Sequence, residues 1–562
     1  MSDTTLASRL CEKLRENAGC IFTVPGTQNI GLLNQLTNSQ LQVVNASSEL
    51  GAAFMANGWA RKHPKPAVLM TIAGPGITTA ISGITEALHD SAPILVIVVE
   101  GIDRKRTFDL QKIDLDALLS PVCKEVLCID SLRDAAALID RALHTVSSDE
   151  PGPVVLRLAA PLLFEKCPES TYQTEVSGGH PELAELARRI KESRKPIVFA
   201  GAGASGAAPV LLDIIENGAI PVVTTASGRG TLSDSHPFCL TYDFSFGVGP
   251  MLNALLDGSD LILVLGAKLS HNGTGGFSLK LPQERLVRID TSSIVLEANY
   301  PASLSICCDA SVALTTLSGL IDDYRSAWTD SELVEKKASL ADEAASLAPR
   351  PPKLAGLPAS EFFSALRAAC GRGTTFCTDS GYHQVLTRQY LEVLSPRTLV
   401  LPSDFQSMGF GLPAAIGASL ADPSSRTTAI IGDGGFLMTA TELASAVHLD
   451  LNLSVIVLRD EWYGLIRMQQ AATFGRTPST ALPNFSVQKY AEAAGAQYFL
   501  LDKPTEANWR QLFPRSGVVV AEVPVGKLPG LSAKQAGTAV KEQIRSVLGQ
   551  DAINSLKKLL GR

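Results

Sequence analysis

Short runs of hydrophobic residues alternate along this chain with segments in which apolar residues recur at helical spacing. A helix expected over 437–449, apolar on one face, lies between apolar runs at 428–431 and 453–458. Buried parallel strands have such uninterrupted runs, and helices connect one strand to the next. The pattern therefore predicts strand-helix-strand units and an α/β fold.

The same alternation occurs in three parts of the chain. Expected strands cover 22–26, 68–72, 93–99, 195–200, 220–225, 260–266 and 285–290, besides the two named above. A chain of 562 residues exceeds one hydrophobic core, and polar stretches at 165–181 and 324–358 are typical of linkers. We predict three doubly wound parallel-sheet domains over 1–170, 186–330 and 355–530, followed by a C-terminal tail over 531–562. The first and third domains share one order of elements, which is compatible with duplication.

Two acidic turns follow neighbouring expected strands in the third domain. The turn at 432–436 reads Gly-Asp-Gly-Gly-Phe and includes Asp433, and the next strand runs into a turn that contains Asp460. The carboxyl ends of parallel strands meet at one edge of a sheet, where such folds bind ligands. Glycines let backbone N–H groups approach a phosphate at a helix start, but two carboxylates repel it unless a cation lies between them. The turns predict a divalent ion bound to a diphosphate, with two solvated aspartates as the alternative.

This segment resembles the diphosphate-binding signature of the thiamine-diphosphate enzymes, and acetolactate synthases and related 2-oxo acid decarboxylases are the most similar subgroup. The resemblance implies that Asp433, Asp460 and Trp462 bind Mg²⁺. It also implies that thiamine diphosphate contacts Gly432, Gly434, Gly435, Tyr463 and Gly464.

The first domain resembles the part of these enzymes that binds the aminopyrimidine ring. The segment 48–61 is similar to the helix whose glutamate contacts N1′, which implies that Glu49 is catalytic; a helix-capping charge is the alternative. The turns at Pro25, Gly26 and Gly74 are implied cofactor contacts. Gln111 matches a glutamine that faces the reacting carbons in acetolactate synthases, with a surface glutamine beside the charged loop 103–106 as the alternative.

The third domain contains three further matches to these enzymes. Tyr382 and His383 follow an expected strand and resemble a segment that contacts the diphosphate, although a histidine at a strand end can simply be solvated. The segment 404–418 resembles one in which Met408 would be the apolar wedge that bends the cofactor, and the Gln406 carbonyl would accept from its 4′-amino group.

The implied reaction is decarboxylation of a small-molecule 2-oxo acid with carboligation to an acceptor carbonyl. The alternatives are a simple decarboxylase that releases an aldehyde, and a flavin- or nicotinamide-binding oxidoreductase. Gln469 occupies the place of a tryptophan that selects the acceptor in biosynthetic acetolactate synthases, and Ser48 replaces the usual histidine. The identity of the oxo acid and the acceptor is left open.

The central domain contains a Gly-x-Gly-x-x-Gly turn at 201–206 between two expected strands. The second strand ends in Thr224 and Thr225, where a nicotinamide-binding unit has an acidic residue for the ribose. The resemblance implies a central domain that binds FAD or an ADP-type nucleotide in some relatives, and we do not expect one to be retained here.

Composition limits the kinds of partner and the cellular location that we expect. A net charge of −7 offers no basic surface for nucleic acid, no apolar run is long enough for a bilayer, and the first residues lack a secretory pattern, so we expect a cytoplasmic protein. Ten cysteines without Cys-x-x-Cys spacing indicate neither a zinc site nor a disulfide framework. The family resemblance implies a homodimer or homotetramer with sites between subunits, and no obvious tether would fold the first domain onto the third of the same chain.

Overall fold

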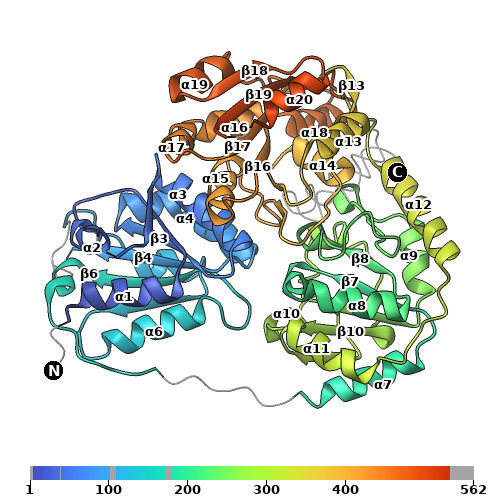
Figure 1. Ribbon diagram of the computed structural model, residues 1–562, viewed down its shortest axis with the longest axis horizontal. Coiled ribbons are helices and arrows are strands. Elements are labelled where there is room, and N and C mark those ends of the chain that lie inside the picture. The colour runs from blue at the N-terminus through green and yellow to red at the C-terminus, as the bar shows by residue number, and fades with distance from the viewer. Residues whose placement is uncertain (1–3, 38, 102–108, 173–179, 515, 532–562) are drawn as a thin grey trace, which may run out of the picture.

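The computed structural model describes residues 4–37, 39–101, 109–172, 180–514 and 516–531, which form three α/β domains (Figure 1). The predicted fold of three parallel-sheet domains is confirmed. The predicted tail from 532 onward and the charged loop 103–106 lie outside the described residues. None of the described helices combines the length and apolar character needed to cross a membrane.

The first domain is a six-stranded parallel sheet in the order β2-β1-β3-β4-β6-β5. Its strands are β1 (Cys20–Thr23), β2 (Gln42–Asn45), β3 (Ala67–Ile72), β4 (Ile94–Glu100), β5 (Glu125–Ile129) and β6 (Val154–Ala159). Its helices are α1 (Leu6–Asn17), α2 (Ile30–Leu36), α3 (Glu49–Lys62), α4 (Pro75–His89), α5 (Leu115–Leu119) and α6 (Ala135–Thr145). Successive side chains of β4 enter different cores, Leu95 beside α1 and α6 and Val96 beside α3 and α4. Helices on both faces explain why this strand is apolar throughout.

The central domain is a five-stranded parallel sheet in the order β11-β10-β9-β7-β8. Its strands are β7 (Pro196–Ala200), β8 (Val222–Thr224), β9 (Leu261–Leu265), β10 (Leu286–Asp290) and β11 (Leu304–Cys307). Its helices are α7 (Glu182–Glu192), α8 (Ala208–Gly218), α9 (Pro250–Asp257), α10 (Ser293–Glu297), α11 (Ala310–Leu320) and α12 (Asp330–Leu347). The short 3-10 helices among the described residues are η1 (Ala160–Phe164), η2 (Ala202–Ala207), η3 (Ala226–Gly228), η4 (Phe244–Phe246), η5 (Asn272–Thr274) and η6 (Gln283–Arg285).

Much of the expected linker at 324–358 is ordered structure. Helix α12 packs Leu333 and Leu340 into the central core, and buried Glu343 accepts hydrogen bonds from the backbone N–H groups of Met251 and Leu252 at the start of α9. A two-stranded hairpin, β12 (Lys353–Leu354) and β13 (Leu357–Pro358), then leads into the third domain.

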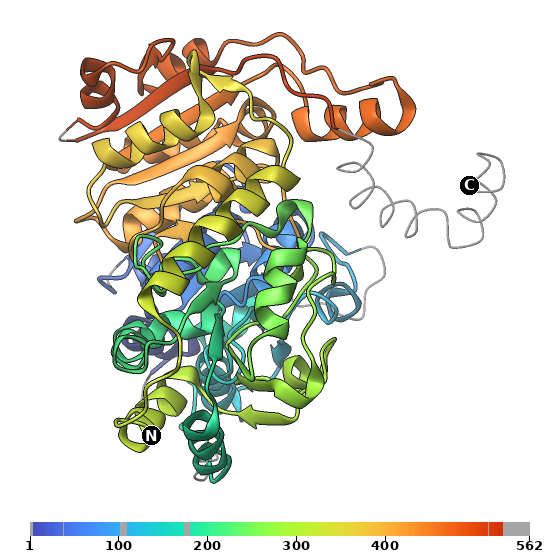
Figure 2. The same ribbon diagram turned by 90° about the vertical axis from the view of Figure 1, so that its right-hand side faces the viewer.

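The third domain repeats the topology of the first, with strand order β15-β14-β16-β17-β19-β18. Its strands are β14 (Thr375–Thr378), β15 (Leu399–Val400), β16 (Thr427–Gly432), β17 (Leu453–Arg459), β18 (Gln497–Leu500) and β19 (Val518–Pro524). Its helices are α13 (Ala359–Ala369), α14 (Tyr382–Tyr390), α15 (Gly411–Ala421), α16 (Asp433–Thr439), α17 (Glu442–His448), α18 (Gly464–Phe474), α19 (Val487–Ala494) and α20 (Glu506–Leu512). Figure 2 shows this domain stacked above the central one.

The helix expected over 437–449 differs from the structure in one respect. It is two helices, and the first begins at Asp433 itself, directly after β16. No residue lies between the end of β16 at Gly432 and the start of α16 at Asp433. The N-terminus of α16 is therefore at the glycine turn.

The first and third domains pack on each other through α3 and α15, and one hydrophobic core continues across both. A Cβ atom at Gly58 of α3 would overlap the carbonyl of Ala414, and one at Gly417 of α15 would overlap the carbonyl of Met55. The two helices approach this closely because each has a glycine at the crossing. The sequence shows no obvious tether for this contact, and the packing of the two helices itself brings the first domain onto the third of the same chain.

This crossing gives a prediction for stability. Gly417→Ala should lower the free energy of unfolding by about 1–3 kcal/mol, because the added methyl group meets backbone that cannot rotate away. Denaturant unfolding of the cofactor-free protein measures the change. Gly319→Ala is the matched control, since a Cβ at this exposed position of α11 meets nothing within 4 Å and should stabilise the helix by up to about 1 kcal/mol. Equal midpoints for Gly417→Ala and the wild type would contradict the prediction.

Candidate active site

The carboxyl edge of the third sheet brings together three loops that the sequence singled out. The chain leaves β14 for β15 on one side and returns to β16 on the other, so the sheet has a switch point between β14 and β16. Ligands of doubly wound sheets bind in the crevice at such a point. The ends of β14, β16 and β17 place His383, Asp433 and Asp460 around it.

Asp433 and Asp460 are held by backbone donors of the same turns. Asp433 accepts from the N–H groups of Gly434 at 3.0 Å and Glu461 at 2.7 Å, and Asp460 accepts from Trp462 at 2.9 Å. Burial, followed by the charge of Asp460, raises the pKa of Asp433 to about 7. Burial raises the pKa of Asp460 to about 6. Two ionised carboxylates are unfavourable here without a cation, which is what a metal ion would supply.

The side chains at this edge also limit which metal ion could bind there. Within the described ranges, no three His, Cys, Asp or Glu side chains are grouped so that they could hold a metal ion. A metal at the Asp433–Asp460 pair would need further oxygen ligands, and the Trp462 residue can offer only its backbone carbonyl. An oxygen-rich shell completed by a ligand phosphate is the coordination that Mg²⁺ prefers.

Glycines line the edge where a ligand would approach. A Cβ at Gly432 would lie 2.8 Å from Nδ1 of His383, and one at Gly434 would lie 2.9 Å from the ring of Tyr463. Side chains at Gly435 and Gly464 would overlap the carboxylates of Asp379 and Asp460. The predicted contacts in these two turns, Gly432, Gly434, Gly435, Tyr463 and Gly464, therefore lie at one crowded edge.

His383 is buried in this edge rather than solvated. Burial lowers its pKa to about 4, so the imidazole is neutral near neutral pH. Its Nε2 atom has no hydrogen-bond partner in the part of the chain that is described, so one buried ring nitrogen is available to a ligand at this edge. The neighbouring Tyr382 side chain instead packs in the domain core, leaving only its backbone at the helix start.

Asp379 was not predicted and organises the same edge. Its side chain is fully buried and accepts from the N–H groups of Ser380 at 2.7 Å and Gly409 at 3.0 Å. Burial raises its pKa to about 7. This carboxyl group ties the end of β14 to the loop before α15, and a lone acid between a strand and a glycine was its only sequence signal.

A second cluster lies at the switch point of the first sheet, between β1 and β3. A Cβ at Gly26 would lie 2.7 Å from Ile72, and one at Gly74 would lie 2.7 Å from Cβ of Gln111. Gln111 is partly buried, and its Oε1 accepts from Gln28 at 2.9 Å. The structure thus places Gln111 against the Gly74 turn, beside Gly26, while Pro25 stays exposed. Gln28 was not predicted.

Glu49 belongs to this first-domain cluster. It is the first residue of α3, and a Cβ at Gly76 would lie 3.3 Å from its Oε1. Ser48 caps the helix by accepting from the N–H of Gly51 at 3.0 Å, so the helix start does not depend on the Glu49 side chain. Buried Glu442 of the third domain accepts from the N–H groups of Ser47 and Ser48 and fixes the preceding turn.

The loop before α15 carries the other predicted contacts. Gln406 has a φ of 62°, a region that non-glycine residues rarely adopt. Its side chain donates to the carbonyl of Pro402 at 2.8 Å and accepts from Ser380 at 3.1 Å, and Met408 is partly buried. Strained backbone of this kind is typical of functional sites.

Comparison with known proteins agrees with this geometry. The chain matches the thiamine pyrophosphate enzyme family in three parts. These are the N-terminal TPP binding domain over residues 4–115, the central domain over 183–317, and the C-terminal TPP binding domain over 379–523. The chain belongs to the thiamine pyrophosphate enzymes. These domains contain the two clusters described above, the third-domain edge with Asp433 and Asp460 and the first-domain cluster with Glu49, and each cluster is one half-site. The protein is therefore a thiamine-diphosphate-dependent enzyme.

Several relatives extend over most of this thiamine pyrophosphate enzyme. The acetolactate synthase large subunit of Lactococcus lactis is 28% identical over 90% of this chain and 90% of its own length. The acetolactate synthase isozyme 1 large subunit of Escherichia coli is 28% identical over 80% of each chain. A putative thiamine pyrophosphate-containing protein of Bacillus subtilis is 26% identical over 95% of this chain and 94% of its own length.

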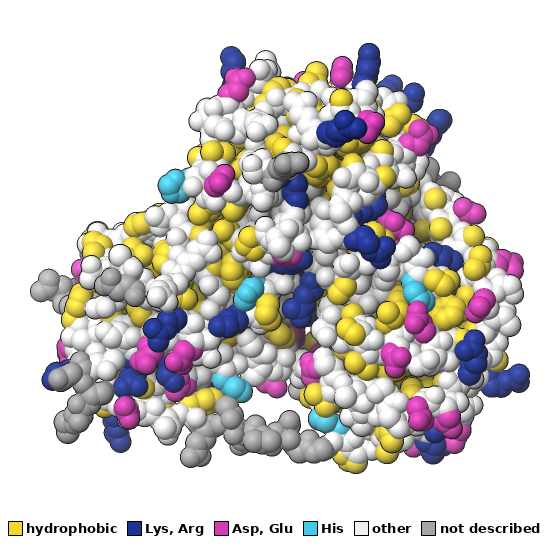
Figure 3. All heavy atoms as spheres, in the orientation of Figure 1, with side chains coloured by type: hydrophobic (Ala, Val, Ile, Leu, Met, Phe, Trp, Pro, Cys, Tyr) yellow, Lys and Arg dark blue, Asp and Glu magenta, His cyan; other side chains and the backbone are white. Residues whose placement is uncertain are grey.

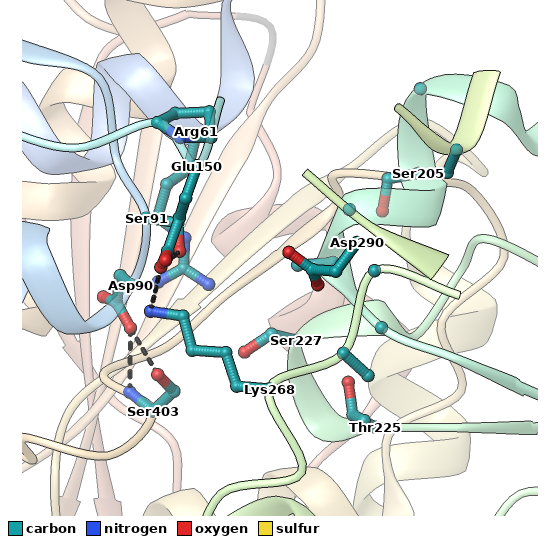
Figure 4. A pocket seen from close by; sticks show the side chains of 18 of the residues that line it. Arg61, Asp90, Ser91, Glu150, Ser205, Thr225, Ser227, Lys268, Asp290 and Ser403 are labelled. Carbon is teal, nitrogen blue, oxygen red and sulfur yellow. Dashed lines mark hydrogen bonds and ion pairs between the residues drawn. The ribbon is translucent and has the colours of Figure 1, made fainter. Parts of the chain in front are cut away.

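The enzyme also has a cavity of about 430 Å³ where its three domains meet. Figure 3 shows the hollow between the first and central domains, and Figure 4 shows Asp90, Thr225, Asp290 and Ser403 around the cavity, with Lys268 crossing it to Glu150. Side chains at Gly201 would overlap Gly266, so close packing of the β7 and β9 ends accounts for that glycine. The expectation that no FAD or ADP-type nucleotide is retained stays a prediction.

The metal assignment gives a second prediction. Asp433→Ala should weaken binding of both Mg²⁺ and thiamine diphosphate by at least about tenfold, because one of two carboxylates is lost. Cofactor content after gel filtration measures the effect. Asp502→Ala, at an exposed acid of the same domain, should leave that content unchanged. Wild-type cofactor occupancy in Asp433→Ala would show that the metal assignment is wrong.

Proposed function

We propose that this enzyme decarboxylates a 2-oxo acid and joins the resulting carbanion equivalent to an acceptor carbonyl. The observation that carries the proposal is the pair of half-sites at equivalent switch points of two sheets with one topology. One half offers Glu49 and Gln111, and the other offers paired carboxylates beside a glycine turn. The similarity to acetolactate synthases supports carboligation as the outcome.

Each residue would have a distinct task. Glu49 would hold and move a proton at N1′ of the aminopyrimidine, Met408 would support the bent cofactor, and the Gln406 carbonyl would accept from the 4′-amino group. Asp433 and Asp460 would hold Mg²⁺ against the diphosphate, completed by the Trp462 carbonyl. When bound, thiamine diphosphate supplies a thiazolium ring that stabilises the electron pair released with carbon dioxide.

The resemblance to acetolactate synthases implies that Gln469 bears on the acceptor side of the site. Gln469 on α18 is partly buried and presents an amide where biosynthetic acetolactate synthases have tryptophan. An amide offers both a donor and an acceptor, which suits a polar acceptor carbonyl better than an extended apolar one. On this basis the amide of Gln469 favours a small, hydrophilic acceptor.

Glu49 provides the direct test of this mechanism. Glu49→Gln should lower kcat by about 100-fold or more, because proton transfer at N1′ is lost while the amide keeps the shape. Steady-state turnover of 2-oxo acids, with analysis for a 2-hydroxy-3-oxo product, measures it. Glu182→Gln in the first turn of α7 is the matched control for a helix-start charge and should retain activity. Near-normal turnover in Glu49→Gln would rule out the assigned role.

We further infer that each site is shared between two copies of the chain. Glu49 lies beside Gly76 at the start of α4, whereas Glu86 near the other end of α4 binds the loop of Gln406 and Met408 in the same chain. Ten helical residues between these points correspond to about 15 Å. One aminopyrimidine ring cannot bridge that distance, so the loop serving Glu49 comes from a second copy.

Exposed apolar side chains beside both half-sites support this arrangement. Leu110 and Ile113 flank Gln111 and are 79% and 40% exposed, and Met438 and Ile466 near the glycine turns are 49% and 44% exposed. Exposed apolar side chains beside a site are typical of a surface that a partner covers, and a second copy would cover these. A homodimer, or a homotetramer built from dimers, fits these surfaces.

Subunit mixing tests the shared site. Equal amounts of Glu49→Gln and Asp433→Ala chains should recover roughly one quarter of wild-type activity, since half of the dimers are mixed and each has one intact site. Activity is measured after exchange has been verified by mass spectrometry of differently tagged chains. Absence of recovery after verified exchange would place each site within one chain.

A further inference from the structure

Glu86 is a buried acid that has no role among the residues assigned above to the proposed reaction. It lies on α4 with none of its surface exposed, and its Oε2 accepts from the backbone N–H of Ser407 at 2.8 Å. Within the described part of the chain, no Lys, Arg or His forms an ion pair with it; Arg61 pairs with Asp90 and offsets the charge of Glu86 only in part, and Oε1 has no partner with hydrogen-bond geometry. Burial of a carboxyl group with so few compensating contacts lowers the stability of the fold. Its presence here therefore indicates a specific function.

The hydrogen bond to Ser407 sets the direction of a neighbouring carbonyl group. The N–H of Ser407 and the C=O of Gln406 belong to one peptide unit, which is trans because the described chain has no cis peptide bonds. In a planar trans peptide the two groups point in opposite directions. By fixing the N–H, Glu86 fixes the direction of the Gln406 carbonyl on the other side of the loop.

Other first-domain residues hold the same loop at different points. Asp90 accepts from the N–H and hydroxyl of Ser403, and the rings of His89 and Phe405 stack with their centroids 5.4 Å apart. These contacts fix the position of the loop as a whole. Glu86 alone among them binds the peptide unit that contains the Gln406 carbonyl.

We propose that Glu86 is a positioning residue for the proposed reaction, and that it aims the Gln406 carbonyl at the 4′-amino group of thiamine diphosphate. The proposal rests on the proposed function. A carboxylate acceptor also polarises the peptide unit, which makes the carbonyl at its other end a stronger acceptor. The stronger acceptor would raise the electron density on the 4′-nitrogen and so make that nitrogen a better base toward the proton on C2 of the cofactor.

Exchange of the C2 proton for deuterium in the bound cofactor tests the proposal. Glu86→Met keeps the volume of the side chain and removes the acceptor, so exchange in enzyme saturated with thiamine diphosphate and Mg²⁺ should slow by at least about tenfold. Cofactor affinity should change by less than about threefold, because the diphosphate contacts are intact. Burial and the nearby Asp90 raise the pKa of Glu86 to about 7, so the comparison is made above neutral pH.

The conservative variant Glu86→Gln keeps an oxygen acceptor without the charge, and its exchange rate should lie between those of the wild type and Glu86→Met. Wild-type exchange in folded, saturated Glu86→Met would overturn the proposal. If Glu86→Met does not fold, Glu86→Gln decides, and a rate equal to that of the wild type overturns it.

Two control variants distinguish the proposed role of Glu86 from a general loss of stability and from a failure of the proposed function. Glu343→Met removes another buried acid that accepts from backbone N–H groups, in the central domain, and should lower stability while leaving exchange unchanged. Glu49→Gln should stop exchange nearly completely. If Glu49→Gln exchanges normally, the proposed function itself fails, whereas an effect of Glu49→Gln without one of Glu86→Met refutes only the role of Glu86.

Discussion

The close crossing of α3 and α15 is the constraint on which the site depends. These helices occupy the same topological position in two sheets of the same strand order, and one continuous core lies between those sheets. Gly58 and Gly417 permit the contact, and a side chain at Gly51 would overlap Glu442. Because Glu49 begins α3 and the loop of Met408 ends where α15 starts, the crossing sets the position of both half-sites at once.

Buried acids that bind backbone N–H groups recur around this core. Asp379, Asp433, Glu86 and Glu442 all accept from loop N–H groups, and burial raises the pKa of each. Such groups cost stability when no cation compensates them. A bound cation would favour the ionised forms of these acids and so offset part of this cost.

The sequence predictions for the site rest on local signals. Glycine turns after apolar strands led to the prediction of Gly432 and Gly74, and the structure places both turns at strand ends beside a switch point, which the order of elements determines. The partnership of Glu86 with Ser407 joins residues 321 positions apart, and that of Glu442 with Ser47 joins residues 395 apart. Such contacts depend on how domains pack, which periodicity along a single segment cannot reveal.

The central domain has a structural role that needs no nucleotide. Arg229 forms a buried ion pair with Asp234 and donates to the carbonyls of Arg388 and Leu391 at the end of α14, each at 2.6 Å. Arg388 in turn pairs with Asp243 at 3.0 Å. A guanidinium at a helix C-terminus complements the helix dipole, and the first turn of the same helix carries His383. The central domain therefore fixes α14 from its C-terminal end, while His383 lies at the other end of the same helix.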